Sequence, residues 1–180
     1  MNKIVLHVGC GSLRIEHLPG FLQNGWEEIR VDIDPLVEPD YVSSLTNLSV
    51  IHDNSVDAVY SAHNLEHLYA HEVPVAFAEF YRVLRSNGLV FITLPDLLSV
   101  AQEAVSKGLE HVIYESSMGP ITPLDVIYGH QGKIAQGNSF MAHKTGFSSD
   151  TLKNALLAAG FEQINLNKKD YALWATGVRP

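Results

Sequence analysis

The stretch Ile4–Ser12 constrains the fold more than any other part of the chain, because an apolar run ends there in Gly-x-Gly. The run is typical of a buried parallel strand. Gly9 and Gly11 allow a sharp turn where a side chain would collide with a ligand. The pattern therefore predicts a ligand across the carboxyl end of the strand. A tight turn that binds nothing is the alternative.

A second predicted strand, Glu28–Ile33, brings a carboxylate towards the same ligand. Asp32 lies 23 positions after Gly9, close to the offset of about 20 residues at which nucleoside-binding folds place an acid on the ribose hydroxyls. Asp32 and Asp34 alternate along the strand, so only one of them faces the ligand if the strand stays regular. Asp34 precedes a proline, which is typical of the start of a turn.

The rest of the chain alternates predicted strands and helices. Strands are expected at Tyr41–Ser43, Val56–Ala62 and Leu89–Leu94, and helices from Pro74 to Asn87–Gly88, over Asp96–Val105, and from a cap at Ser148 or Ser149 to Gly160. Two final segments, Phe161–Lys168 and Tyr171–Val178, are typical of a hairpin. This order predicts an α/β fold with a doubly wound, mostly parallel sheet that ends in an antiparallel hairpin. We expect one domain, residues 1–180.

Composition narrows the class of protein. The chain has 180 residues, 46% of them hydrophobic and 18% charged, and no apolar run long enough to span a bilayer. The first strand follows the N-terminus directly, without the apolar segment of a signal peptide, so we expect a cytoplasmic protein. The net charge of −8 without a Lys/Arg cluster argues against nucleic acid as a partner. Cys10 has no partner for an internal disulfide, and a small residue in a tight turn is favoured over a catalytic thiol.

Four motifs occur in a recognisable order: L-H-V-G-C-G at 6–11, V-D-I-D at 31–34, H-N-L-E-H at 63–67 and R-V-L-R-S-N-G at 82–88. With them, nearly the whole chain resembles the class I S-adenosylmethionine-dependent methyltransferases. More narrowly, it resembles small predicted methyltransferases with L-x-x-G-C-G, V-D-I-D and H-x-L-E-H motifs. The resemblance implies a Rossmann-like fold, S-adenosylmethionine as cofactor, and methyl transfer to an acceptor that we expect to be a small molecule.

The resemblance also implies a set of cofactor-binding residues at the ends of the first four strands: His7, Gly9, Cys10, Gly11, Asp32, Ile33, Ser44, Leu45 and His63. The chain departs from the superfamily pattern in several places. Leu13 replaces a third glycine, and Pro19–Gly20 predicts that the first helix is short or missing. His7 stands where an acid usually lies near the methionine ammonium. Ser44 and Leu45 stand where many relatives have an acid, leaving a hydroxyl or a backbone N–H for the adenine.

Methyl transfer requires that the acceptor is held close to the methyl group and, for a hydroxyl or amine, that a proton is removed. A neutral imidazole suits this near pH 7. His63 follows the fourth strand directly and is the first candidate. Glu66, His130 and His143 rank lower, and proximity without a base is a further alternative.

Two other functions stay open. The letters H-x-x-E-H at 63–67 match a group of zinc peptidases, and with His71 three imidazoles would lie on one helical face. A zinc-dependent hydrolase using His63, Glu66 and His67 is therefore one alternative. Because the motif follows a central strand, we expect no metal ligand. A non-catalytic S-adenosylmethionine-binding module is the other alternative.

The segment 108–147 differs from the rest. It is rich in glycine and lacks long periodicity, with at most a short helix at Pro123–Tyr128 after Thr122. An irregular segment of this length inside a domain is either a functional lid or disordered. Its aromatic residues and histidines favour a substrate lid.

Overall fold

A seven-stranded sheet with one antiparallel strand among parallel ones organises the molecule, in the order β3-β2-β1-β4-β5-β9-β8. The computed structural model describes residues 2–180. The strands are β1 (Lys3–Val8), β2 (Trp26–Asp32), β3 (Tyr41–Val42), β4 (Val56–Ala62), β5 (Leu84–Pro95), β8 (Glu162–Lys169) and β9 (Ala172–Val178). β1 to β5 pair in parallel, and β9 is antiparallel to both β5 and β8. The predicted fold class is confirmed.

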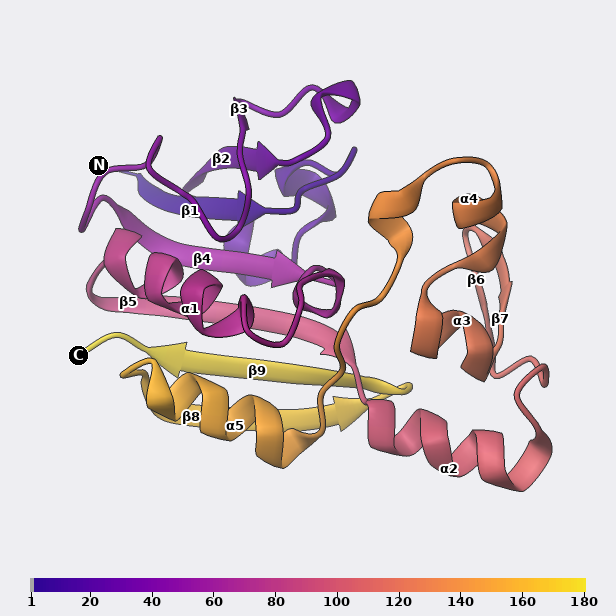
Figure 1. The fold of residues 1–180 in the computed structure, drawn as a ribbon. Helices are drawn as coiled ribbons and strands as arrows, with labels where there is room; N and C mark the ends of the chain where they lie inside the picture. The colour runs from indigo at the N-terminus through magenta and orange to yellow at the C-terminus, as the bar shows by residue number, and fades with distance from the viewer. Residues whose placement is uncertain (1) are drawn as a thin grey trace.

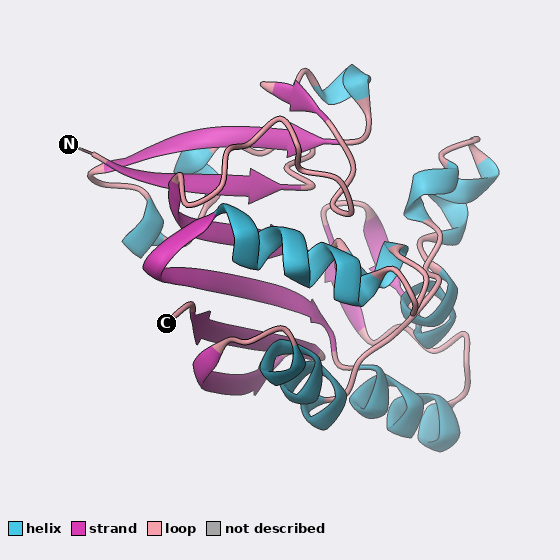
Figure 2. Ribbon diagram, turned by 60° about the vertical axis from the view of Figure 1, so that its left-hand side comes forward, coloured by secondary structure: helices cyan, strands magenta, loops and turns pink. Residues whose placement is uncertain are grey.

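Two long helices, α1 (Val73–Val83) and α5 (Ser149–Ala158), cover the same face of this sheet (Figures 1 and 2). Phe77 and Phe80 of α1 and Leu152 and Leu156 of α5 are fully buried against the strands. Their spacing of three and four residues produces one apolar stripe on each helix. This face contains the main core.

The opposite face has no long helix among the described residues. The chain between β1 and β2 forms only two 3-10 turns, Ile15–His17 and Gly20–Leu22, which confirms the predicted loss of the first helix. Leu18 and Leu22 pack there on Val5, Ala58 and Tyr60. Further along the sheet, Trp174 of β9 remains 42% exposed.

One helix prediction needs correction, and the next is confirmed within two residues at each end. The helix expected to reach Asn87–Gly88 ends at Val83, because the backbone becomes extended at Leu84 and starts β5. The next helix, α2 (Leu97–Lys107), buries only Val100, and Val105 is 90% exposed. Leu97, Ala101 and Ala104 were expected on the same side as Val100 and are partly buried, so the predicted apolar side is confirmed except at Val105.

The segment 108–147 is more regular than predicted. It contains the hairpin β6 (Tyr114–Ser116) and β7 (Gly119–Ile121), helix α3 (Pro123–Tyr128) with the predicted cap at Thr122, and helix α4 (Gln131–Ala135). Its small core packs on Val100 of α2. Figure 1 shows the segment beyond the carboxyl ends of the parallel strands. None of the helices in residues 2–180 is long and apolar enough to cross a membrane.

The start of α5 yields a test of the fold. The Ser148 hydroxyl accepts a hydrogen bond from Thr151 N, so Ser148 is the cap and Ser149 is the first helical residue. Ser148→Ala should lower the free energy of unfolding by about 1 kcal/mol. Ser149→Ala is the matched control and should change it by less than about 0.5 kcal/mol. Urea unfolding measures both, and equal losses would mean that the cap is misplaced.

Candidate active site

The glycine turn after β1 has two glycines with different surroundings. Both have positive φ, 58° at Gly9 and 52° at Gly11. A Cβ on Gly9 would lie 2.0 Å from Asn64 Oδ1, and the Asn64 amide donates to the Val8 carbonyl over 2.9 Å. A Cβ on Gly11 would meet nothing within 4 Å. Gly9 is thus required by packing against the loop after β4, whereas the space beside Gly11 is open to a ligand.

Asp32 lies against this turn. Its Oδ2 accepts from Gly11 N over 2.8 Å and its Oδ1 accepts from Asp34 N over 2.9 Å. The Asp34 carboxylate instead accepts from Leu36 N at a 3-10 turn, as expected for a turn start. Each Asp32 oxygen keeps a lone pair that can accept from a ligand hydroxyl. The structure therefore brings Asp32 and Gly11 together and leaves Asp34 outside.

Arg30 holds the loops on both sides of Asp32, a role that the sequence did not suggest. Its side chain is 3% exposed, and its guanidinium donates to four backbone carbonyls, those of Gly11, Leu13, Val37 and Glu38. The first two belong to the turn after β1 and the last two to the loop after β2. Only two features of the sequence were signals of this role: Leu13 replaces a third glycine, and the helix after the first strand was expected to be short or missing. Both imply that the carbonyls of this turn need hydrogen-bond donors from elsewhere.

His7 and Cys10 are buried, each 1% exposed. His7 Nδ1 lies 2.8 Å from Glu28 Oε1. Burial lowers the pKa of His7 more than Glu28 raises it, so the imidazole is neutral. Burial raises the pKa of Cys10 to about 11, which disfavours a reactive thiol. Neither side chain reaches the open space beside Gly11.

The other predicted cofactor residues are spread along the same edge of the sheet. Ile33 is 51% exposed. The Ser44 hydroxyl lies 2.9 Å from that of Thr46, and Leu45 packs against the main core. Ile33 thus presents an apolar surface at the end of β2, while Ser44 keeps its hydroxyl close to a neighbouring side chain.

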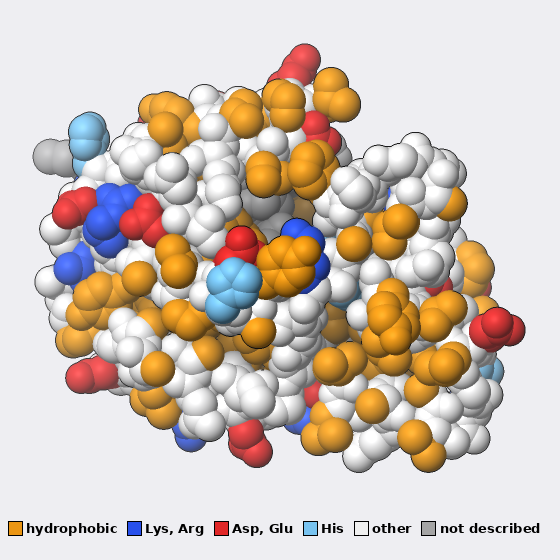
Figure 3. Space-filling model, in the orientation of Figure 1, with side chains coloured by type: hydrophobic (Ala, Val, Ile, Leu, Met, Phe, Trp, Pro, Cys, Tyr) orange, Lys and Arg blue, Asp and Glu red, His pale blue; other side chains and the backbone are white. Residues whose placement is uncertain are grey.

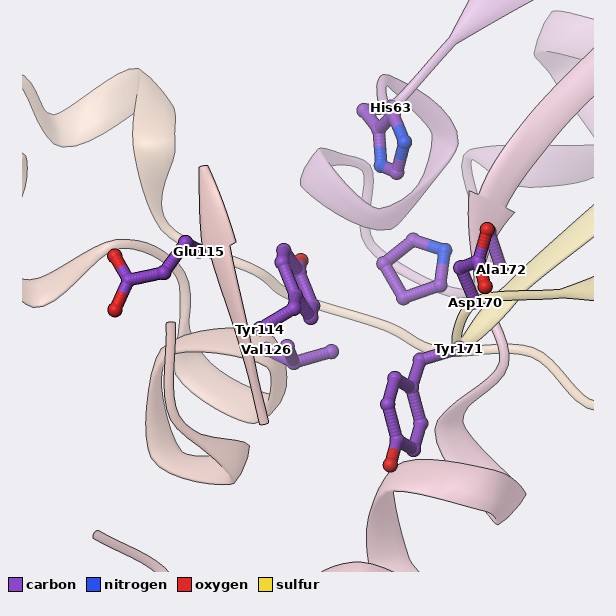
Figure 4. A pocket seen from close by; sticks show the side chains of 8 residues that line it. His63, Tyr114, Glu115, Val126, Asp170, Tyr171 and Ala172 are labelled. Carbon is purple, nitrogen blue, oxygen red and sulfur yellow. The ribbon is translucent and has the colours of Figure 1, made fainter. Parts of the chain in front are cut away.

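His63 adopts a left-handed backbone conformation, with φ of 54°, and its amide donates to Thr93 O over 2.8 Å. Such a conformation costs roughly 1–3 kcal/mol in a residue other than glycine and is concentrated at functional sites. The sharp turn directs the ring into a cavity of about 380 Å³. In Figure 4, His63 and Tyr114 face this cavity, whereas the Glu115 carboxylate points away.

The cavity is built from four parts of the chain that are distant in sequence. Its lining comes from the ends of β4 and β5, from segment 108–147 and from the β8–β9 turn: His63, Pro95, Tyr114, Glu115, Val126, Asp170, Tyr171 and Ala172. Figure 3 shows a depression between the strand-end loops and segment 108–147. Among these residues the sequence had singled out only His63 as a site residue, although the aromatic content of 108–147 was a signal for Tyr114.

Glu66 lies beside His63, with Oε1 3.3 Å from His63 Nδ1. Burial alone would lower the pKa of His63, but the adjacent carboxylate outweighs burial and raises it. Burial likewise raises the pKa of Glu66, and His63 outweighs this effect and lowers it. Glu66 is therefore ionised although its side chain is only 2% exposed.

The helical arrangement proposed for H-x-x-E-H is wrong. Only a 3-10 turn, Leu65–His67, follows His63, and His71 stacks on Tyr69 instead. The three imidazoles therefore share no helical face. His143 lies next to His67, with ring centroids 4.8 Å apart. The Nδ1 atom of His130 accepts from Lys133 N at the start of α4, and His130 does not line the cavity.

Comparisons with known proteins support the predicted fold and match part of the chain to a family. Residues 6–92 match a family described as a methyltransferase domain. A Pyrococcus horikoshii OT3 protein aligns over 99% of this chain and 82% of its own, with 17% identity and a TM-score of 0.66. An Archaeoglobus fulgidus S-adenosylmethionine-dependent methyltransferase aligns over 98% and 86%, with 15% identity and a TM-score of 0.62.

A third similar structure is the 1,6-didemethyltoxoflavin-N1-methyltransferase of Burkholderia thailandensis, with bound 1,6-didemethyltoxoflavin and S-adenosylhomocysteine. It aligns over 98% of this chain and 71% of its own, with 16% identity and a TM-score of 0.62. No curated protein matches the chain. The sheet and these likenesses define a Rossmann-like methyltransferase fold. The family match over residues 6–92 and this fold agree with the resemblance to the class I S-adenosylmethionine-dependent methyltransferases.

The Arg30 contacts lead to a stability prediction. Arg30→Met keeps the apolar stem but removes four charged hydrogen bonds to buried carbonyls, so the free energy of unfolding should fall by about 3 kcal/mol. Arg85→Met is the matched control, because Arg85 is half-exposed and pairs with Asp57 at the surface. Its loss should stay below about 1 kcal/mol. Urea unfolding of both variants checks this, and similar losses would refute the special role of Arg30.

Proposed function

We propose that this chain binds S-adenosylmethionine at the glycine turn and transfers its methyl group to a small molecule in the cavity beside His63. The observation that carries the proposal is the position of His63. It directly follows β4, as the first residue of the loop that places Asn64 over Gly9, and its ring lines the cavity. One loop therefore borders both the cofactor turn and the acceptor space.

The donor groups at the strand ends fit this cofactor. Asp32 has lone pairs for the two ribose hydroxyls, and Ile33 offers an apolar surface to the adenine. The open side of Gly11 leaves room for the bound cofactor. The short turns after β1 lack the regular helix start that a pyrophosphate requires. S-adenosylmethionine has no phosphate, so the absence of that helix favours it over a dinucleotide.

The cavity suits a small acceptor with a flat or apolar part. Its volume of about 380 Å³ lies within the range of small-molecule sites, roughly 300–1,000 Å³. Tyr114, Val126 and Pro95 supply apolar surface. The similar Burkholderia enzyme holds 1,6-didemethyltoxoflavin, a small molecule. Segment 108–147 contributes Tyr114 and Val126, so it acts as the lid that selects the acceptor.

His63 takes the proton of the acceptor in this proposal. When bound, the cofactor supplies an activated methyl group together with its sulfur leaving group. Nδ1 of His63 faces Glu66, which leaves Nε2 to accept a proton from a hydroxyl or amine. The left-handed backbone orients the ring, which is 54% exposed and so remains accessible to an acceptor.

Cofactor binding is the first test. Isothermal titration should detect S-adenosylmethionine or its demethylated product, and Asp32→Asn should weaken binding by about 1.5–3 kcal/mol. Asp34→Asn is the control and should have little effect, because Asp34 only caps a turn. Melting temperatures separate lost binding from lost folding. Absence of heat at millimolar ligand would exclude the proposal.

The role of His63 is tested by two substitutions. His63→Ala and His63→Asn should each lower turnover by about 10²–10⁴-fold, with cofactor affinity nearly unchanged. Asparagine tolerates the left-handed backbone and keeps a polar side chain, but it accepts no proton near pH 7. Full activity in His63→Asn would show that His63 only shapes the pocket. Cofactor binding without turnover on any acceptor would instead indicate a non-catalytic binding module.

A further inference from the structure

Three potential metal ligands meet beside the cavity, although the sequence predicted none. Glu66 and His67 belong to the loop after β4, and His143 lies 76 positions after His67. One ligand atom from each residue lies within 4.8 Å of the other two. In Figure 1 the chain returning from segment 108–147 passes beside the loop after β4. The fold therefore unites residues that no local sequence pattern connects.

The hydrogen bonds of the two histidines determine which ring nitrogen is free. His67 Nδ1 lies 3.1 Å from Ala142 O, and His143 Nδ1 lies 2.6 Å from Val126 O. A carbonyl oxygen only accepts, so each Nδ1 must carry the hydrogen. In the neutral rings each Nε2 then has a free lone pair. This arrangement, with N–H donated to a carbonyl, is typical of metal-ligating histidines.

The Glu66 carboxylate supplies the third lone pair. Its side chain is 2% exposed, and neither oxygen has a hydrogen-bond partner within the described part of the chain. The nearest donor is His63 Nδ1, 3.3 Å from Oε1. A buried carboxylate is costly without close partners, and a cation among the three groups would satisfy the lone pairs that His63 leaves free.

We propose that Glu66, His67 and His143 bind one divalent transition-metal ion of the zinc type. Two imidazoles and one carboxylate suit Zn²⁺, Co²⁺ or Ni²⁺, whereas Mg²⁺ and Ca²⁺ prefer oxygen ligands alone. Bonds of about 2.0–2.2 Å require the three ligand atoms to move closer together. His63 is not part of the set, which therefore differs from the zinc trio suggested by H-x-x-E-H.

The ion joins segment 108–147 to the loop after β4. The backbone is already docked there, because Lys144 N and Thr145 N both donate to Glu66 O, over 2.8 and 3.2 Å. Val126, whose carbonyl orients His143, and His63, which contacts Glu66, both line the cavity. Three protein ligands leave a fourth position for water or an acceptor oxygen. The site thus fixes the lid and does not depend on methyl transfer.

Cobalt titration tests the proposal. The full chain, first dialysed against a chelator, should bind one equivalent of Co²⁺ with the strong visible absorption of a low-coordinate site, and Zn²⁺ should displace it. His143→Ala and Glu66→Gln should each weaken binding by at least about tenfold. His52→Ala is the matched control, because His52 is exposed and outside the cluster. Circular dichroism verifies that the variants fold.

Hydrogen exchange provides a second readout, independent of activity. Zn²⁺ should slow amide exchange in 108–147 of the wild-type chain and leave it unchanged in His143→Ala. Failure of the wild-type chain to bind Co²⁺ or Zn²⁺ at micromolar concentration would overturn the proposal. Undiminished binding in both ligand variants would overturn it as well.

Discussion

The guanidinium of Arg30 is the interaction on which the cofactor end of the sheet depends. A regular helix after β1 would satisfy its own backbone carbonyls, but this chain has only 3-10 turns there. The buried guanidinium of Arg30 supplies the missing hydrogen-bond donors. It connects the loop after β1 to the loop after β2. Asp32 is held between the two loops. One buried charge thus replaces a secondary-structure element as the support of the site.

Most of the sheet could be predicted because its signals are local. The apolar runs of β1 and β4 and the hairpin β8–β9 follow directly from residue types, and Ser148 was one of the two serines predicted as a helix cap. The prediction failed where neighbours decide the conformation. Leu84 continues the apolar stripe of α1, yet it pairs with Val56 as the start of β5. Residues in 108–147 form regular structure against α2, which local periodicity did not indicate.

The site was predictable only where its residues follow from local sequence signals. Gly9, Gly11 and Asp32 form one feature because β1 and β2 are neighbouring parallel strands, a relation that their spacing encodes. The approach of Asn64 to Gly9 and of His143 to His67 depends on how distant loops pack. The H-x-x-E-H pattern suggested imidazoles on one helical face, but only a 3-10 turn follows His63. Long-range packing, and not residue type, determines which groups meet.

The position of β9 in the sheet affects how the protein folds during translation. β9 follows every other strand of the sheet in the sequence, but it lies between β5 and β8. The 76 residues between Pro95 and Ala172 take a ribosome roughly 4–15 s to add. During that interval β5 has an unpaired edge of backbone donors and acceptors, which other nascent chains can join. The sheet of this protein therefore closes after translation of β9, and the cell must protect an open edge until then.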